Sequence, residues 1–199
     1  MSDALYYEAD TGDPDAFDAP LITEEYRRLN AELHERRPDY GVSGHKWARA
    51  VHSLAAQYGA RDILDYGCGK ETLARAMETS DYGAKCSART GKRIVGYDPA
   101  IPGLDAPPEP ADLVVCGDVL EHVEPECLDA VLDDLARLTK KVAFLVVATR
   151  LAKKTLADGR NAHLIVRPPQ WWMPKIMARF HVKQYEWNGG EFAAVVEPK

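Results

Sequence analysis

A glycine-rich bend between an apolar strand and a helix constrains this chain more than any other feature. Residues 63–66 form a short apolar run typical of a buried strand, and Gly67-Cys68-Gly69 follows directly. From Glu71 to about Thr79 the pattern becomes helical. Glycines let the backbone turn sharply and approach a ligand closely, and the free N–H groups at a helix start attract anionic groups. The bend therefore predicts a ligand site at the carboxyl end of a strand.

An acid at the end of the next strand supports this interpretation. Residues 93–97 have the pattern of a strand, and Asp98 follows them directly. Because the carboxyl ends of parallel strands meet at one edge of a sheet, Asp98 is placed beside the glycine bend. A carboxylate there can accept hydrogen bonds from ribose hydroxyls. The two features together predict a ligand that contains a nucleoside.

The remaining strands indicate the fold class. Further strands are expected at 112–116 and at 142–148, the most continuous β-branched run of the chain. Asn188-Gly189-Gly190 separates two more strands, 182–187 and 192–196, and favours a hairpin. Strands that alternate with helices are typical of a parallel sheet. The fold class is therefore predicted to be α/β, with a doubly wound, mostly parallel sheet and a C-terminal antiparallel hairpin.

Apolar residues at helical spacing mark the other helices, expected at 23–37, 43–59, 125–138 and 168–180. Thr23 and Ser43 are placed to cap the first two helices. Pro174 is expected to break the last one, because proline removes a backbone hydrogen bond inside a helix.

The net charge of −6 is concentrated at the start of the chain. Residues 1–18 hold six acids and no lysine or arginine, so the rest of the chain is neutral. We expect an acidic, flexible arm at 1–20, N-terminal helices at 21–59 that include a lid from Tyr40 to Trp47, and the main domain at 60–199. A neutral body argues against broad, non-specific binding of nucleic acid, which needs many cations.

The cysteines and the apolar runs suggest a compartment. No apolar run approaches the ~18 residues of a membrane span, and the polar, acidic start does not resemble a signal peptide. Cys68, Cys86, Cys116 and Cys127 form no C-x-x-C pair and no zinc spacing. We therefore expect reduced thiols, a cytoplasmic location and no membrane partner.

Three motifs resemble those of class I S-adenosylmethionine-dependent methyltransferases: Ile63-Leu64-Asp65-Tyr66-Gly67-Cys68-Gly69, Val95-Gly96-Tyr97-Asp98, and Asp112-Leu113-Val114-Val115-Cys116-Gly117-Asp118-Val119-Leu120-Glu121-His122-Val123. The resemblance spans roughly residues 40–199, and the closing hairpin fits the reversed last strand of that family. It implies a Rossmann-like fold whose domain at 60–199 binds S-adenosyl-L-methionine as cofactor.

The same resemblance implies roles for individual residues. Asp98 would hold the ribose of the cofactor. Gly117 and Asp118 would form the floor where the cofactor and the acceptor meet. Asp65, Gly67 and Gly69 would line the methionine moiety, and Cys68 would also belong to the cofactor-binding residues.

Two departures from the family pattern affect the expected fold. Glu71 stands where the family usually has a third glycine, and residues 99–111 leave no room for the usual helix and edge strand 3. We therefore expect a sheet without that strand and a less enclosed adenine pocket, with Asp105 as a candidate contact. A nicotinamide-binding protein fits less well, because the third glycine of its fingerprint would fall at Thr72. A relative that binds the cofactor without turnover is the other alternative.

A D-x-x-E-H pattern after the third strand is the strongest candidate for the acceptor site. Asp118, Glu121 and His122 would share one face of a helix, and His163 lies in the loop after the last parallel strand, at the same edge of the sheet. Two carboxylates and two imidazoles could together bind Mg²⁺ or Mn²⁺. Without a metal, His122, His163 and Asp118 remain the candidate catalytic residues, with a histidine as general base.

This pattern is similar to the E-x-x-E-H plus distant histidine of methyltransferases that act on the 2′-hydroxyl at RNA 3′ ends. Ubiquinone-pathway O-methyltransferases have a related pattern. In such a site the metal would hold vicinal oxygens and lower the pKa of the attacking hydroxyl. Here Asp118 replaces the first glutamate, which shortens its reach. The competing interpretation is a metal-free enzyme in which Glu121 and His122 cap the helix and orient the loop.

Cations crowd the loop around His163 and indicate either an anion pocket or a solvated loop: Arg150, Lys153, Lys154, Arg160 and Arg167. Trp171 and Trp172 are candidates for stacking on a planar acceptor, and one of them is expected in the core. The sequence thus favours methylation of an O or N atom of a small, anionic acceptor. Metal-assisted 2′-O-methylation of RNA ends and a catalytically silent regulatory protein are the alternatives, with nucleic acid the less favoured partner.

Overall fold

The computed structural model describes residues 20–79 and 93–199. The acidic arm expected at 1–20 lies outside these residues except for its last position, and the loop expected at 80–92 lies outside them entirely. The helices are α1 (Glu24–Arg36), α2 (Ala48–Gln57), α3 (Thr72–Thr79), α5 (Leu128–Leu138) and α6 (Pro169–Arg179), with the short 3₁₀ helices η2 (Ser43–Trp47), η3 (Leu120–His122) and η4 (Pro125–Cys127). None of the described helices is long and apolar enough to cross a membrane.

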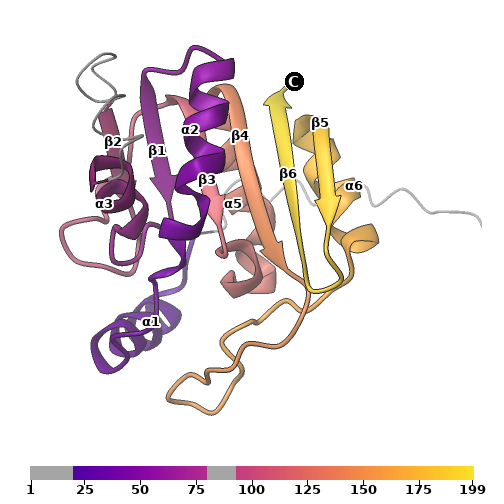
Figure 1. The fold of residues 1–199 in the computed structure, drawn as a ribbon. Coiled ribbons are helices and arrows are strands. Elements are labelled where there is room, and N and C mark those ends of the chain that lie inside the picture. Colours follow the sequence, from indigo (N-terminus) through magenta and orange to yellow (C-terminus); the bar gives the residue numbers. More distant parts are fainter. Residues whose placement is uncertain (1–19, 80–92) are drawn as a thin grey trace, which may run out of the picture.

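The strands are β1 (Asp62–Tyr66), β2 (Arg93–Tyr97), β3 (Ala111–Gly117), β4 (Thr139–Ala148), β5 (Phe180–Trp187) and β6 (Glu191–Pro198). They form one sheet in the order β2-β1-β3-β4-β6-β5 (Figure 1). The first four strands of this order are parallel, and β6 is antiparallel to both β4 and β5. Residues 98–110, between β2 and β3, contain no helix or strand, so the usual edge strand is missing there as expected. The predicted Rossmann-like α/β fold with its C-terminal hairpin is confirmed.

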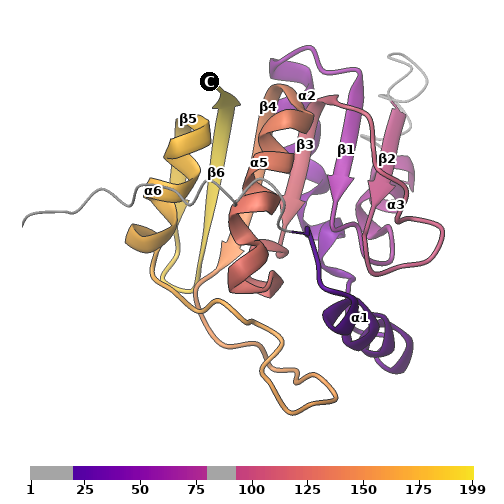
Figure 2. The ribbon, with the colours of Figure 1, turned by 180° about the vertical axis from the view of Figure 1, so that it is seen from behind.

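Helices cover both faces of the sheet. α2 and α3 lie on one face, and α5 and α6 lie on the other (Figures 1 and 2). In β4, Val146 packs in the layer with α2 and α3, whereas its neighbours Leu145 and Val147 pack in the layer with α5 and α6. Burial on both faces explains why 142–148 is apolar throughout. The sheet is therefore a rigid support for the residues at its carboxyl edge.

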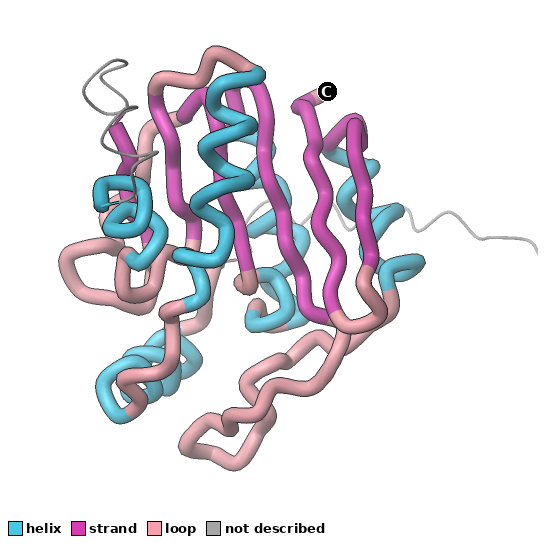
Figure 3. The backbone as a smooth tube through the Cα atoms, viewed as in Figure 1, coloured by secondary structure: helices cyan, strands magenta, loops and turns pink. Residues whose placement is uncertain are grey.

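α1 and the long loop 149–168 lie beyond the carboxyl ends of β1, β3 and β4 (Figures 1 and 3). The two segments share a small apolar cluster, separate from the main core, that contains Tyr26, Leu29, Leu33, Leu156 and Ala162. They therefore cover together the edge of the sheet where the sequence places its candidate ligand site.

The start of α1 is held by a buried carboxylate. Thr23 caps the helix as expected, because its Oγ accepts a hydrogen bond of 3.2 Å from the Tyr26 backbone N–H. The carboxylate of Glu124, which lies between η3 and η4, accepts hydrogen bonds from Thr23 N at 2.9 Å and from Thr23 Oγ at 2.7 Å. These bonds join α1 to the loop after β3, so the helix has a fixed position over the edge of the sheet.

The expectation that Ser43 caps the second helix is wrong. Residues Ser43–Trp47 form the 3₁₀ helix η2, and α2 begins only at Ala48. η2 packs closely on the start of α3, where a Cβ on Gly44 would lie 3.1 Å from the backbone N of Leu73. This tertiary contact favours the tighter 3₁₀ turn over an α-helical start.

The expected break at Pro174 is also wrong, because α6 runs without interruption from Pro169 to Arg179. Proline at this position removes only one hydrogen bond of the helix. Trp172 and Ile176, on either side of it, are fully buried against the sheet. Packing of these side chains holds the helix together across the proline.

Candidate functional site

The candidate site is a cavity of about 340 Å³ at the carboxyl edge of the sheet, between the strand ends and α1. Residues from β1, β2, β3 and the loop after β4 meet there because the carboxyl ends of parallel strands lie side by side. The structure brings the residues predicted to bind the cofactor, a metal or the reacting proton to this one cavity: Asp65, Gly67, Cys68, Gly69, Asp98, Gly117, Asp118, Glu121, His122 and His163.

The glycine bend has the conformation that its sequence predicts. Gly67 has φ of 75° and Gly69 has φ of 52°, in the left-handed region that favours glycine. The N–H of Gly69 donates a hydrogen bond of 3.1 Å to Oδ2 of Asp98, and the N–H of Ala100 donates one of 3.0 Å to Oδ1. Asp98 therefore holds the bend in place and is itself held, with lone pairs on both oxygens still available.

Glu71 does not block the cavity. It has φ of 54°, so it occupies the left-handed conformation for which the usual third glycine would be suited. Such a conformation costs a residue with a side chain roughly 1–2 kcal/mol. A Cβ on Gly96 would lie 3.5 Å from Glu71 Oε1, so the carboxylate lies beside β2, and Glu71 is not among the residues that line the main cavity. The departure is thus a local strain and leaves the site open.

Carboxylates give the cofactor end of the cavity a negative character. Burial raises the pKa of Asp65 to about 7, and the nearby charges of Asp98 and Glu71 raise it further. An acid with this pKa is only partly ionised near neutral pH, because burial and the neighbouring carboxylates disfavour its charge. A ligand that carries positive charge would relieve this repulsion.

The segment expected to act as a lid lies directly against the glycine bend. A Cβ on Gly69 would lie 2.6 Å from the carbonyl oxygen of Gly41, which also accepts a hydrogen bond of 2.9 Å from the backbone N–H of Lys70. At the other end of the segment, a Cβ on Gly117 would lie 3.0 Å from the Trp47 ring. The glycines at positions 41, 69 and 117 therefore permit these close contacts. The opening of this segment as a lid remains a prediction.

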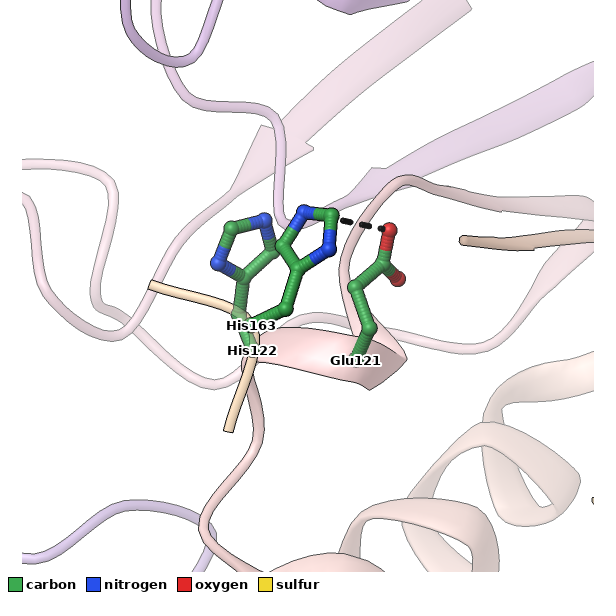
Figure 4. Close-up of side chains that lie close together, drawn as sticks. All are labelled: Glu121, His122 and His163. Atoms are coloured by element: carbon green, nitrogen blue, oxygen red, sulfur yellow. Dashed lines mark ion pairs between the residues drawn. The ribbon is translucent and has the colours of Figure 1, made fainter. Parts of the chain in front are cut away.

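Glu121, His122 and His163 form a compact cluster at the other end of the cavity. Their candidate ligand atoms lie within 4.8 Å of one another. Figure 4 shows the Glu121 carboxylate directed toward the imidazole rings, and Oε1 lies 4.0 Å from Nε2 of His163. The two rings meet edge to face with centroids 4.7 Å apart.

Backbone carbonyls determine which nitrogen of each histidine carries the proton. Nδ1 of His122 lies 2.7 Å from the Ala162 carbonyl oxygen, and Nδ1 of His163 lies 2.6 Å from the Arg150 carbonyl oxygen. A carbonyl only accepts hydrogen bonds, so both Nδ1 atoms are protonated and donate. Both Nε2 atoms are therefore left with a free lone pair.

Burial keeps the cluster largely uncharged. It raises the pKa of Glu121 to about 8, with a further contribution from the charge of Asp118. It lowers the pKa of His122 to about 3, and the neighbouring His163 adds to this effect. The pKa of His163 is also lowered, chiefly by burial. Both imidazoles are therefore neutral near pH 7, and their Nε2 lone pairs can bind a cation.

The expectation that Asp118 shares a helix face with Glu121 and His122 is wrong. The helical turn η3 begins only at Leu120. Asp118 precedes it in a left-handed turn with φ of 59°, and its N–H donates to the Val146 carbonyl oxygen. Asp118 lines the cavity but does not belong to the cluster of Glu121, His122 and His163.

Several residues expected near the acceptor lie elsewhere. Arg160 and Arg167 do not line the cavity, and Arg160 pairs with Asp158 at 2.7 Å. The two tryptophans of α6 do not line it either. Trp172 is fully buried in the core, where its indole N–H donates to the Arg167 carbonyl oxygen. Asp105 is exposed and accepts a hydrogen bond from the Gly103 N–H, away from the cavity.

Cations nonetheless reach the cavity from two sides. Arg150 lines it but pairs with Glu191 at 3.5 Å, and Lys154 lines it but pairs with Asp39 at 3.2 Å. Lys153 and Lys46 of η2 also line it, and neither ammonium group has an ion pair or hydrogen bond with the described residues. These two lysines are therefore available to an anionic ligand.

Sequence reasoning missed the contribution of α1. Tyr26, Asn30 and His34 recur every fourth residue and line the cavity from this helix. Trp47 of η2, expected as the end of the lid, lines it as well. The available signal was that polar side chains share the inward face of an amphipathic helix, where apolar ones are usual.

Comparisons with known proteins agree with this geometry. A family model described as a methyltransferase domain matches residues 33–187. The chain is similar in fold to Burkholderia thailandensis 1,6-didemethyltoxoflavin-N1-methyltransferase, solved with 1,6-didemethyltoxoflavin and S-adenosylhomocysteine. The TM-score is 0.55 at 17% identity, over 92% of this chain and 93% of that one. No curated protein matches the chain in sequence.

Two further solved structures have similar folds. DhpI in complex with S-adenosylhomocysteine gives a TM-score of 0.56 at 15% identity, over 89% of this chain and 98% of that one. An O-methyltransferase family protein from Burkholderia thailandensis gives 0.52 at 12% identity, over 90% of this chain and 63% of that one. At such identities these structures establish the fold, whereas the family model covers most of the chain. The chain therefore belongs to the methyltransferase domain family and is an S-adenosylmethionine-dependent methyltransferase.

Proposed function

We propose that the protein methylates an oxygen or nitrogen atom of a small, anionic acceptor. The observation that carries this proposal is that one cavity of about 340 Å³ contains both the acids of the cofactor end and the free imidazole nitrogens of the other end. This volume is near the lower end of small-molecule sites, which supports a small acceptor rather than a macromolecule.

The cofactor end suits a positively charged nucleoside derivative. S-adenosylmethionine carries a sulfonium and an ammonium group, and Asp65 and Asp118 line the cavity with acidic side chains. Asp98 would bind the ribose hydroxyls with the lone pairs that its two backbone hydrogen bonds leave free. Gly67 and Gly69 would let the backbone lie close to the cofactor.

The acceptor end suits an anion that must lose a proton. Lys46 and Lys153 line the cavity without acidic partners among the described residues, so they could bind a carboxylate or phosphate. S-adenosylmethionine supplies an electrophilic methyl group, so the chain must mainly position the nucleophile and remove its proton. We assign the proton-accepting role to Nε2 of His163, because its lone pair is free and the Arg150 carbonyl oxygen, 2.6 Å from Nδ1, can stabilise the resulting imidazolium.

Similar solved structures support both kinds of acceptor atom. One is an N1-methyltransferase solved with the small molecule 1,6-didemethyltoxoflavin, and another belongs to an O-methyltransferase family. We therefore leave the choice between oxygen and nitrogen open and take the small, anionic character of the acceptor from the cavity and its lysines.

Calorimetry with the wild-type protein tests the cofactor part of this proposal. S-adenosylmethionine is expected to bind at one site with a Kd of about 1–100 μM. NAD⁺ is the matched control, because it also contains an adenosine but needs the glycine fingerprint that this chain lacks. No heat of binding at about 1 mM S-adenosylmethionine, or tighter binding of NAD⁺, would contradict the proposal.

A metal-assisted reaction on the 2′-hydroxyl of RNA ends is the second candidate, and the Glu121–His122–His163 cluster favours it. Both Nε2 atoms are free, and Oε2 of Glu121 is buried without a hydrogen-bond partner among the described residues. Metal-binding histidines are commonly oriented by a hydrogen bond from their other nitrogen, as both are here. Two imidazoles and one carboxylate suit Mn²⁺ better than Mg²⁺. Such an ion would lower the pKa of an acceptor hydroxyl.

Thermal unfolding in the presence of Mn²⁺ tests the cluster as a metal site. Mn²⁺ at 100 times its Kd is expected to stabilise the wild-type protein by about 2.7 kcal/mol, or roughly 5–10 °C in Tm. Glu121→Gln should lose this shift, whereas Glu126→Gln, a change of an exposed carboxylate on η4, should retain it. A shift that persists in Glu121→Gln would mean that the ion binds elsewhere. Labelling of single-stranded RNA that chelator leaves undiminished would exclude the metal-assisted reaction.

A further inference from the structure

We propose that the inward polar face of α1, formed by Tyr26, Asn30 and His34, recognises the acceptor, and that the acceptor is a planar acid with a neutral hydrogen-bonding edge. This inference rests on the proposed function and deepens it by naming the residues that select the substrate. None of the three belongs to the expected cofactor cradle or to the Glu121–His122–His163 cluster.

Unpaired polar atoms point to this face. Oη of Tyr26, Oδ1 of Asn30 and Nδ1 of His34 are buried and have no hydrogen-bond partner within the described residues. Such atoms are rare, because burial without a partner is costly. The two other atoms of this kind in the described residues, Nε1 of Trp47 and Oε2 of Glu121, also belong to residues that line the same cavity. The unpaired groups thus surround one space, as expected if a ligand completes their hydrogen bonds.

Helical geometry places the three α1 side chains in one row. A spacing of four residues brings positions 26, 30 and 34 onto the same face of the helix. The row extends over about 12 Å at 1.5 Å per residue, which is the length of a small molecule. α1 is also firmly held, because the Glu124 carboxylate accepts two hydrogen bonds from Thr23. A fixed row of polar groups can discriminate between acceptors without reordering.

The position of the row in the chain favours the acceptor over the cofactor. The family model begins at residue 33, so Tyr26 and Asn30 precede the part of the chain that the family shares. The expected cofactor residues, from Asp65 to Asp118, all lie inside the matched range. A shared methyl donor should be bound by shared elements, whereas an acceptor particular to this protein can be bound by an added one.

The chemistry of the row indicates what it would bind. Burial raises the pKa of Tyr26 and lowers that of His34, so the phenol and the imidazole are both neutral near pH 7. The Asn30 amide can donate and accept at once, so the row suits a neutral edge that does the same, such as that of a heteroaromatic ring or a diol. The Tyr40 ring contacts His34 edge-on with centroids 4.6 Å apart, which provides an aromatic wall for a planar group. Lys46 and Lys153 would bind the acid group.

Two conservative variants test the row. Tyr26→Phe and Asn30→Leu remove the unpaired atoms with little change in volume, and Arg28→Gln on the exposed side of α1 is the matched control. The first measurement is the Kd of S-adenosylmethionine, expected to stay within about threefold of wild type in all three variants. The second is the Tm of protein saturated with S-adenosylhomocysteine, with 3,4-dihydroxybenzoate, orotate or urate added as planar acids.

At least one of these three acids at about 1 mM is expected to raise the Tm of the wild-type protein by about 3 °C or more. Tyr26→Phe and Asn30→Leu should each lose at least half of that shift, and Arg28→Gln should keep it. The inference is overturned if none of the acids shifts the wild-type Tm. It is equally overturned if both variants keep the shift, because water rather than the acceptor would then bind the polar atoms of Tyr26 and Asn30. It is also overturned if the variants weaken S-adenosylmethionine more than tenfold, since the row would then serve the cofactor. Failure of the wild-type protein to bind S-adenosylmethionine at all would instead refute the proposed function.

Discussion

Replacing Asp98 with alanine is expected to weaken the binding of S-adenosylmethionine at least 100-fold. The Asp98 carboxylate is buried and fixed by hydrogen bonds from the backbone N–H groups of Gly69 and Ala100. It can therefore accept hydrogen bonds from the ribose hydroxyls without first being ordered. Hydrogen bonds to a charged group contribute about 1.5–3 kcal/mol each, so the loss of two corresponds to roughly 100-fold or more in Kd.

Calorimetric titration of Asp98→Ala and Asp98→Asn measures this effect. The asparagine variant keeps one oxygen acceptor and should fall between alanine and wild type. Asp105→Asn is the matched control, because Asp105 is an exposed acid in the same connection and accepts a hydrogen bond from the Gly103 N–H. A Kd for Asp98→Ala within about threefold of wild type, in a protein that is still folded by circular dichroism, would refute the assignment of Asp98 to the ribose.

Asp98 also illustrates which part of the site the sequence could predict. The strand, the glycine bend and the acid after the next strand are local patterns, and the rule that parallel strands end at one edge brings them together. The same reasoning predicted the missing edge strand from the length of residues 99–111 and the hairpin from Asn188-Gly189-Gly190. These predictions succeed because each depends on few residues and on a strong backbone preference.

The sequence failed where tertiary contacts decide the local structure. Ser43 has the features of a helix cap, yet close packing of Gly44 on α3 produces a 3₁₀ turn. Pro174 should break a helix, yet the buried side chains around it preserve α6. Asp118 was expected on a helix that begins two residues later. In each case propensity is a weak preference that packing overrides.

The contribution of α1 to the acceptor end could not be predicted because its residues have the appearance of surface residues. Asn30 and His34 interrupt the apolar face of α1, but the sequence does not tell whether such a polar position faces a cavity or solvent. The cations after β4 misled in the other direction. Arg160 has the appearance of an anion-binding residue, but it is paired with Asp158 and does not line the cavity. Only the three-dimensional arrangement tells which polar groups are buried, unpaired and directed into the cavity.

Replacing Asp65 with asparagine is expected to stabilise the ligand-free protein at pH 8 while it weakens cofactor binding. Burial, together with the charges of Asp98 and Glu71, raises the pKa of Asp65 to about 7. In the unfolded chain an aspartate has a pKa of about 3.9. The folded state therefore prefers the protonated carboxyl, and the stability that this group contributes is complete below about pH 4 and lost as the pH rises through about 7.

An asparagine is neutral at every pH, so the difference between the variant and the wild-type protein should open between pH 4 and pH 7. A shift of about three pKa units corresponds to at most about 4 kcal/mol, and we expect about 2–4 kcal/mol at pH 8, or roughly 5–12 °C in Tm. Near pH 4 the two proteins should unfold at similar temperatures. If Asp65→Asn is less stable than wild type at pH 8, the carboxylate makes a favourable contact in the fold, and the argument from burial is wrong.

Binding of S-adenosylmethionine should depend on the same ionisation in the opposite sense. A cationic cofactor favours the ionised carboxylate, so the wild-type affinity should fall roughly tenfold from pH 8 to pH 6 as Asp65 takes up a proton. Asp65→Asn should bind more weakly than wild type at pH 8 and show little dependence on pH. S-adenosylhomocysteine is the matched ligand, because it lacks the sulfonium charge and should show a smaller dependence. Equal pH profiles for the two ligands in the wild-type protein would mean that Asp65 does not sense the charge of the methyl donor.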